Sequence, residues 1–213
     1  MKSLTQHITE KLVLNSNSKI RKQEHKYHPK TKDELVEIIK TEVEKNGWEC
    51  DLNHIDVSQI TDMSSLFSEA YAGYGLEKFN GDISEWNVSN VKDMSDMFWF
   101  AESFNSDISK WDVGKVTDMS EMFNGATSFN QPICDWDVSK VTNMSHMFKN
   151  AKEFNQPIGD WDVSNVKDMS CMFNYAYSFN RDLSKWKLKA NCDIINIFYD
   201  CPIKEEFKPK FKK

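Results

Sequence analysis

Residues 129–153 read FNQPICDWDVSKVTNMSHMFKNAKE, and the same pattern starts again at Phe104 before this stretch and at Phe154 after it. Each copy opens with Phe-Asn, continues through a Trp-x-Val group and then reaches Met-x-x-Met-Phe. A fixed interval of about 25 residues indicates a stack of repeated units that share one core. The most regular columns are the tryptophans Trp86, Trp111, Trp136, Trp161 and Trp186 and the asparagines Asn80, Asn105, Asn130, Asn155 and Asn180.

The repeat also sets the boundaries of the parts of the chain. Units at the two ends diverge from the pattern, which is typical of repeat proteins because each end must cover an exposed core. The predicted parts are an N-terminal segment (1–51), a divergent first unit (52–78), units that begin at 79, 104, 129 and 154, a degenerate last unit (179–203) and a basic tail (204–213).

Each unit is predicted to contain a helical half and an extended half. Four apolar residues from Met94 to Ala101 follow the i, i+3, i+4, i+7 spacing of one helix face, and Asp93 precedes them at the position of a helix N-cap. Residues 83–91 alternate as an extended segment would. We therefore expect an α/β repeat, a right-handed leucine-rich-repeat-like solenoid of about five to six units.

An N-terminal capping helix is predicted over about residues 31–46. Thr31 can accept a hydrogen bond from the first turn while Glu34 reaches back, which is the capping-box pattern. Apolar residues then follow at helical spacing, and Gly47 is a suitable stop. This helix is expected to seal the open end of the first unit. Residues 1–26 stay open between a loosely held end and a docking arm.

The two most regular columns are interpreted as structural. A tryptophan side chain buries roughly 150–250 Å², and a column of exposed tryptophans would invite aggregation. An asparagine amide both donates and accepts, so stacked asparagines can satisfy main-chain groups at the turns between units. We therefore expect a buried tryptophan column and an asparagine ladder.

Composition argues against two classes of partner. The net charge is −6, and residues 79–178 hold 15 acidic against seven basic side chains, whereas nucleic-acid binding needs positive charge. No apolar run is long enough for membrane insertion or for a signal peptide, so a cytoplasmic protein is expected. The five cysteines have no paired spacing, which favours free thiols in a reducing compartment.

The sequence offers no catalytic constellation. The five histidines do not recur at metal-ligand spacing, and no nucleophile-elbow or phosphate-loop motif is present. Cys134, Cys171 and His146 occupy positions that vary between units, so a Cys–His pair is disfavoured. A cation-binding edge at the recurrent Asp112, Asp137 and Asp162 is likewise less favoured than a solvated acidic face. We expect no enzyme activity, no cofactor and no metal.

Four aromatic residues at variable positions are the candidate partner-binding residues. Trp99 stands where sister units have Asn or Lys, so it is expected to be exposed. Aromatic side chains at such positions are the usual anchors of protein interfaces. Partial packing on a neighbouring loop is the alternative interpretation. The candidates are Trp99, Phe100, Tyr175 and Tyr177.

The units resemble the BspA-like leucine-rich repeat family, most clearly at residues 136–148, which read WDVSKVTNMSHMF. The lead-in from Tyr27 to Ser58 is also similar to that family, and the resemblance covers roughly residues 27–203. Named members are bacterial surface adhesins that bind host proteins, so the resemblance implies a surface role. A signal peptide, anchor or sorting motif is not recognisable, which makes the chain more similar to short intracellular copies in bacteria, phages or mobile elements.

The expected function is that of a non-enzymatic protein-binding solenoid, acting as an intracellular interaction or inhibitor module. A bacterial surface adhesin and a structural virion component remain as alternatives. Repeat proteins read their partners through variable surface residues, so the identity of the partner and the oligomeric state stay open.

Overall fold

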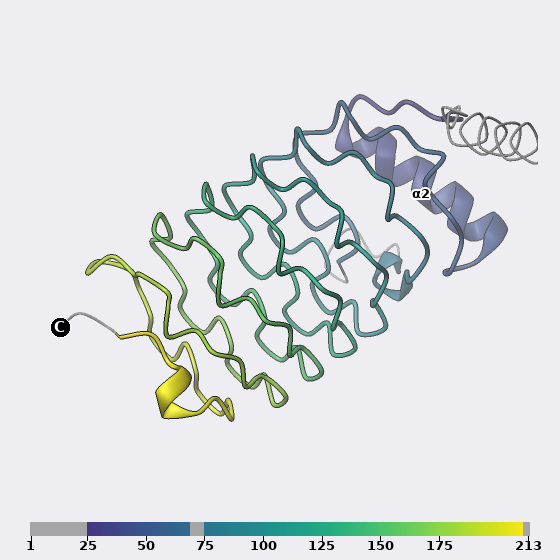
Figure 1. Ribbon diagram of the computed structural model, residues 1–213. Helices are drawn as coiled ribbons and strands as arrows, with labels where there is room; N and C mark the ends of the chain where they lie inside the picture. Colours follow the sequence, from purple (N-terminus) through teal and green to yellow (C-terminus); the bar gives the residue numbers. More distant parts are fainter. Residues whose placement is uncertain (1–24, 69–74, 211–213) are drawn as a thin grey trace, which may run out of the picture.

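The computed structural model describes residues 25–68 and 75–210. Within these ranges the chain has one α-helix, α2 (Lys32–Asn46), and two short 3-10 helices, η1 (Leu76–Lys78) and η2 (Glu205–Phe207). The rest winds into a stack of coils, with α2 at one end and η2 at the other (Figure 1). The first part of the segment predicted for residues 1–51, and most of the loop before η1, lie outside the described residues.

The predicted α/β leucine-rich-repeat solenoid is wrong. No repeat unit in the described ranges contains an α-helix or a regular strand, and strand-type pairing between coils is limited to isolated parallel bridges. The helical spacing from Met94 to Ala101 instead arises from consecutive four-residue turns, in which the Met97 N–H donates to the Met94 carbonyl and the Ala101 N–H to the Phe98 carbonyl. The first and last residues of both turns are buried, which gives the same spacing of buried residues as one face of a helix.

Left-handed residues prevent these turns from merging into a helix. Asp96 and Phe100 both have φ of 55°, and the same two positions are left-handed in later coils. A right-handed helix cannot continue through such a residue. Four-residue spacing of the left-handed positions therefore fixes a chain of turns. In the described ranges these positions are Ser65, Asp96, Glu121, His146, Cys171 and Asn196 in one column and Phe100, Gly125, Asn150, Tyr175 and Asp200 in the other.

Hydrogen bonds to the next coil replace the bonds that a helix would make within itself. Alternate N–H groups of each turn segment donate to main-chain carbonyls of the following coil. In the unit that begins at Phe129, for example, the Phe148 N–H donates to the Met172 carbonyl at 2.9 Å. The corresponding bonds between the first two regular coils run from Met94 to Asp118, Asp96 to Ser120, Phe98 to Met122 and Phe100 to Asn124.

The half of the unit predicted as extended is also made of turns. The Trp86 N–H donates to the Ile83 carbonyl at 3.2 Å, and the Val91 N–H donates to the Val88 carbonyl at 2.9 Å. In the described regular coils, the column of Asp93 forms the parallel bridges that recur from coil to coil. Asp93 is therefore not a helix N-cap, because its Oδ1 accepts from the N–H of Ser95 at 2.9 Å and closes a tight turn.

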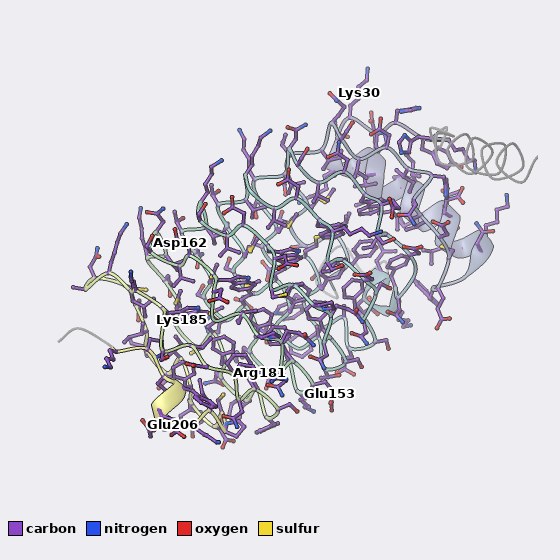
Figure 2. All side chains as sticks on the ribbon, viewed as in Figure 1. Lys30, Glu153, Asp162, Arg181, Lys185 and Glu206 are labelled. Atoms are coloured by element: carbon purple, nitrogen blue, oxygen red, sulfur yellow. The ribbon has the colours of Figure 1, made fainter. Side chains whose placement is uncertain are left out.

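A column of aromatic rings fills the inside of the stack. Phe123, Phe148 and Phe173 are fully buried, and successive ring centroids lie 5.7 Å apart. Each tryptophan of the repeat is 3–4% exposed, and its indole N–H donates to the main-chain carbonyl of an earlier coil. For Trp136 the acceptor is Ile108 at 3.2 Å. Charged residues such as Lys30, Asp162 and Glu206 lie on the outside (Figure 2).

The asparagines form a second column that ties the coils together. The Asn105 N–H donates to Oδ1 of Asn80 at 2.8 Å, and the same bond recurs in each following coil. The last step is from the Lys204 N–H to Oδ1 of Asn180 at 3.1 Å. Residues 204–210, expected as a tail, thus lie against the last unit, where the Leu183 N–H also donates to the Phe207 carbonyl.

Helix α2 closes the N-terminal end of the stack. Thr31 accepts from the N–H of Glu34 at 3.2 Å, while the Glu34 carboxylate reaches back to the N–H of Lys30 at 2.7 Å, one residue earlier than in a capping box. The helix buries Leu35 and Ile39 completely in the common core. It ends at Gly47, whose φ of 87° suits glycine.

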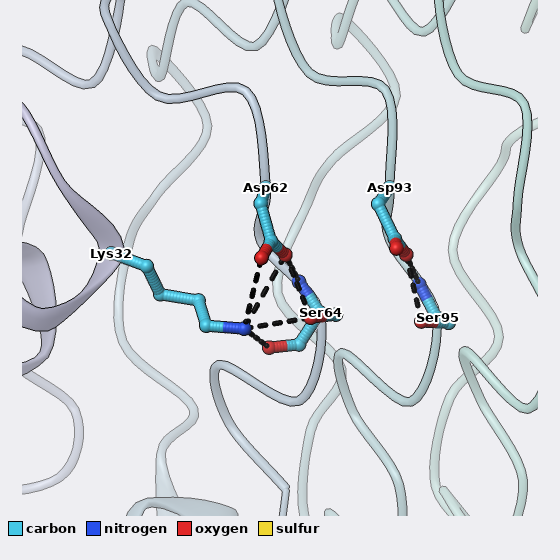
Figure 3. A network of polar contacts seen from close by, with 5 residues as sticks. All are labelled: Lys32, Asp62, Ser64, Asp93 and Ser95. Carbon is cyan, nitrogen blue, oxygen red and sulfur yellow. Dashed lines mark hydrogen bonds and ion pairs between the residues drawn. The ribbon is translucent and has the colours of Figure 1, made fainter.

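Lys32 joins α2 to the first coil (Figure 3). Its ammonium lies 3.3 Å from both carboxylate oxygens of Asp62 and donates to the Ser64 carbonyl at 2.9 Å and hydroxyl at 2.7 Å. A cation on outward-facing carbonyls is favourable for the same reason as at a helix C-terminus, because the peptide dipoles are negative there.

Replacing Lys32 by methionine is expected to lower the free energy of unfolding by about 1–2 kcal/mol, because charged hydrogen bonds to Asp62 and Ser64 are lost. Chemical denaturation measures this change. The matched control is Lys30→Met, since the Lys30 side chain is exposed and its substitution should stay within about 0.5 kcal/mol. Equal effects of the two substitutions would contradict the role given to Lys32.

Candidate functional site

The structure divides the four predicted partner-binding residues into two groups. Trp99 and Phe100 lie together on one coil, with ring centroids 4.4 Å apart. Tyr175 and Tyr177 lie together three units further on, with centroids 6.1 Å apart. Coils that pair through main-chain bonds are about 4.8 Å apart, so the two groups are separated by roughly 14 Å along the stack. They do not form one continuous site.

Trp99 is less accessible than its position in the sequence predicts. It is partly buried, and its indole N–H donates to Oε2 of Glu121 at 3.1 Å. Phe100 is also partly buried, because its ring lies over Gly125 of the next coil. A Cβ added to Gly125 would come within 3.0–3.2 Å of the Phe100 ring atoms. Packing against the next coil is therefore the main contact of these two aromatics within the described chain.

Gly125→Ala is expected to destabilise the protein by about 2 kcal/mol, because the residue has φ of 75° and the methyl group would press on the Phe100 ring. In a Phe100→Ala background the same change should cost only about 1 kcal/mol, the backbone contribution alone. Denaturation of the four proteins of this double-mutant cycle measures the difference. Additive effects would show that the ring does not rest on Gly125.

A tyrosine cluster at the C-terminal end is the most accessible aromatic surface of the described chain. Tyr177 is 51% exposed and Tyr199 is 55% exposed, with Tyr175 between them at 5.5 Å from the Tyr199 ring. The pKa of the Tyr175 phenol is raised, first by its electrostatic interaction with Tyr199 and then by desolvation. Ile195, at 64% exposed, lies on the same last coil.

Sequence reasoning did not identify Tyr199 and Ile195. The last unit departs from the consensus, with isoleucines in the methionine columns, so its sequence indicates only a degenerate end. Spacing nevertheless contained the signal. Tyr199 stands four repeat intervals after Trp99, at a position that Asn124, Lys149 and Asn174 occupy in the units between.

The polar residues of the described ranges do not gather into a metal site. No group of three or more His, Cys, Asp or Glu side chains there is arranged to hold a metal ion. Asp137 and Asp162 each accept from the N–H of the serine two residues later, at 3.0 Å, and these serines lower the pKa of both carboxyls. His146 and Cys171 occupy the same position on neighbouring coils, but no hydrogen bond joins their side chains in the described structure.

Asp96 is the carboxyl with the most perturbed titration in the described chain. Burial raises its pKa from 3.8 to about 6, and the negative charges of Glu121, Asp118 and Asp93 add to this effect. No hydrogen bond to its carboxylate is found among the described residues. Desolvation, and after it repulsion along the stacked acidic positions, therefore destabilises the charged form of Asp96.

Asp96→Asn is expected to raise the midpoint of thermal unfolding by roughly 2–4 °C at neutral pH, an effect limited by the partial solvent exposure of the group. Since the folded-state pKa lies above the unfolded value, protonation stabilises the wild type as the pH falls through about 6. The difference between the two proteins should therefore vanish near pH 4. Scanning calorimetry across this range checks it, and a difference that is constant with pH would contradict the electrostatic cause.

Comparison with protein families gives one match. The family described as "Mycoplasma protein of unknown function, DUF285" matches residues 38–139 and again 107–210. The resemblance to BspA-like leucine-rich repeats is thereby corrected, because the matching family is a different one and the coils lack the helix and strand of that repeat. A surface-adhesin role does not follow from this family. Comparison with curated proteins and with solved structures gave no match.

Among the described residues, no helix has the length and apolar character needed to cross a bilayer.

Proposed function

We propose that this chain, which belongs to the Mycoplasma protein family of unknown function DUF285, is a non-enzymatic protein-binding module. The proposal rests on one observation. The recurrent residues lie in the buried core and in the asparagine column, while Tyr177 and Tyr199 are about half exposed at one end. Clustered, accessible tyrosines are typical anchors of protein interfaces, because they bury a large area and still offer a hydroxyl.

The charge distribution supports a protein partner over a nucleic acid. Residues 79–178 carry an excess of acidic side chains, and a negatively charged surface repels the phosphate backbone of a nucleic acid. The exposed carboxylates of this region, such as Asp137 and Asp162, are fixed by turns rather than gathered around a cavity. An extended rigid surface of this kind suits recognition of another folded protein.

We further propose a reducing, intracellular location and action as an interaction or inhibitor module. All five cysteines are free thiols. Burial raises the pKa of the Cys201 thiol to about 11, and it also raises the pKa of Cys50. Thiols with raised pKa values react slowly, which fits a structural role.

Affinity capture of the tagged chain from a lysate of the organism that encodes it tests the proposal. The wild type is expected to retain one stoichiometric protein, and Tyr177→Ala/Tyr199→Ala to lose it. Trp48→Ala, which removes an exposed aromatic near the opposite end, is the matched control and should retain it. Recovery of no protein by the wild type would contradict an intracellular binding module and turn attention to the cell surface or a virion.

A further inference from the structure

The last coil leaves a row of main-chain donors unused. In the four coils whose turn segments begin at Met94, Met119, Met144 and Met169, four alternate N–H groups donate to carbonyls of the following coil. The preceding coil pairs completely with the last one, for instance from the Phe173 N–H to the Ile197 carbonyl at 2.9 Å and from the Tyr175 N–H to the Tyr199 carbonyl at 3.0 Å. On the last coil the equivalent N–H groups have no hydrogen bond within the described chain; they belong to Ile194, Asn196, Phe198 and Asp200.

This edge differs in kind from an ordinary strand edge. A β-strand presents donors and acceptors in alternation, whereas the segment from Ile194 to Asp200 presents donors, because its carbonyls point back to the preceding coil or into its own turns. Along this segment the main-chain dipoles add from coil to coil, whereas the neighbouring segment bonds in the opposite sense, for instance from the Asp193 N–H to the Lys167 carbonyl. The complement of such an edge is a row of main-chain carbonyls at alternate residues.

The opposite end of the stack has the matching carbonyls, but α2 covers it. Lys32 already donates to the Ser64 carbonyl, and Leu35 and Ile39 of α2 are buried against the first coil. Two copies that met through their last coils would place donors against donors. A second copy of this chain therefore does not complement the open edge.

Side chains around the edge indicate what would complement it. Ile195 and Tyr199 alternate with the free donors and are 64% and 55% exposed. Between Ile194 and Asp200 the chain carries one acidic and no basic side chain, so the exposed apolar side chains are the main feature of this edge.

We propose that the last coil binds a segment of a partner protein that carries apolar side chains, lies along the last coil as an additional coil and accepts hydrogen bonds from Ile194, Asn196, Phe198 and Asp200 through its main-chain carbonyls. Ile195 and Tyr199 cover the apolar side chains of that segment. The principle is that of strand addition to a sheet edge, in which main-chain bonds supply affinity and alternate side chains supply specificity. This inference rests on the proposed protein-binding function and names the chemistry of the partner.

The chain itself supplies a probe for this edge. A capped peptide of the sequence TDMSEMFNGA, residues 117–126, provides the carbonyls that pair with the donors of the preceding coil in the intact protein. Amide NMR spectra of the full chain are recorded while this peptide is added. The four free N–H groups are expected to shift and to exchange with solvent at least about tenfold more slowly at saturation.

Three controls define the outcome. A scrambled peptide should not slow exchange at the four amides. Ile195→Ala/Tyr199→Ala should weaken binding by about tenfold or more. Trp48→Ala should bind as the wild type does, because Trp48 lies outside the last coil.

Unchanged amides of Ile194, Asn196, Phe198 and Asp200 at about 1 mM peptide would overturn the proposal. So would slow exchange of these amides in the free protein together with a dimer in sedimentation, since a second copy would then cover the edge. If the Ile195→Ala/Tyr199→Ala variant still captures the partner protein, this edge is not the binding site, although the chain does bind a protein. If nothing is captured but the peptide binds, the edge stands and the binding function in the cell does not.

Discussion

Phe148→Ala is expected to lower the free energy of unfolding by about 3–5 kcal/mol, the largest loss expected from a single substitution in this chain. The ring is fully buried in the middle of the stack and contacts both neighbouring coils, with centroids 5.7 Å from Phe123 and from Phe173. It also stacks on Phe154 at 3.9 Å. Removing it leaves a cavity that the flanking rings cannot fill without breaking the main-chain bonds between coils.

Urea denaturation at neutral pH measures this loss. Phe198→Ala is the matched control, because Phe198 is only partly buried and has a coil on one side, stacking on Phe173 at 5.7 Å. It should cost roughly half as much as Phe148→Ala. Lys152→Ala, at an exposed position of the same coil as Phe148, should change stability by less than about 0.5 kcal/mol. A loss of under about 1 kcal/mol for Phe148→Ala would contradict a continuous aromatic core.

Glu42→Ala is expected to cost about 2–4 kcal/mol, because one buried carboxylate holds the N-terminal end together. Glu42 of α2 is 4% exposed and accepts from Lys26 at 2.8 Å, from the Tyr27 hydroxyl at 2.7 Å and from Asn46 at 3.0 Å. Its other neighbour is the imidazole of His54 at 3.4 Å. Truncation leaves these polar groups without their common acceptor.

The pH dependence of this effect has a definite sign. The hydrogen bond from Lys26 is the main cause that lowers the pKa of Glu42 below its ordinary value of 4.5. A lowered folded-state pKa means that the charged carboxylate stabilises the protein above pH 4.5, and that this contribution is lost as the pH falls through the folded-state value. Glu42→Gln, which keeps the size and one acceptor, should cost less than Glu42→Ala at neutral pH. Equal costs for both variants at neutral and acidic pH would contradict the ionic role.

The fixed interval of the repeat was sufficient to identify the core, because residues that stack on themselves must recur with the period of the coil. It could not determine the local conformation. Spacing of the type Met94, Met97, Phe98 and Ala101 arises from a helix or from two consecutive turns, and the difference lies in whether alternate N–H groups bond within the segment or to the next coil. The left-handed conformation of Asp96 and Phe100 excludes the helix. Neither residue type indicates that conformation in a sequence, whereas a glycine would.

The sequence points to only two of the three tyrosines in the C-terminal cluster for a related reason. Tyr175 and Tyr177 stood out because regular sister units gave a baseline for comparison. Tyr199 and Ile195 lie in the unit that departs from the pattern, where variation is also expected from an end that covers the core. These two side chains are exposed because no coil follows the last one within the described chain. A local sequence pattern does not show this.

Scalar coupling across hydrogen bonds tests the central claim, that alternate N–H groups join one coil to the next. In deuterated, isotopically labelled protein, NMR detects which carbonyl carbon is coupled to the amide nitrogen of Phe148. Our account predicts coupling to Met172 of the following coil, where the N–H···O distance between the heavy atoms is 2.9 Å. Coupling to Met144, the partner that a helix would give, would contradict it.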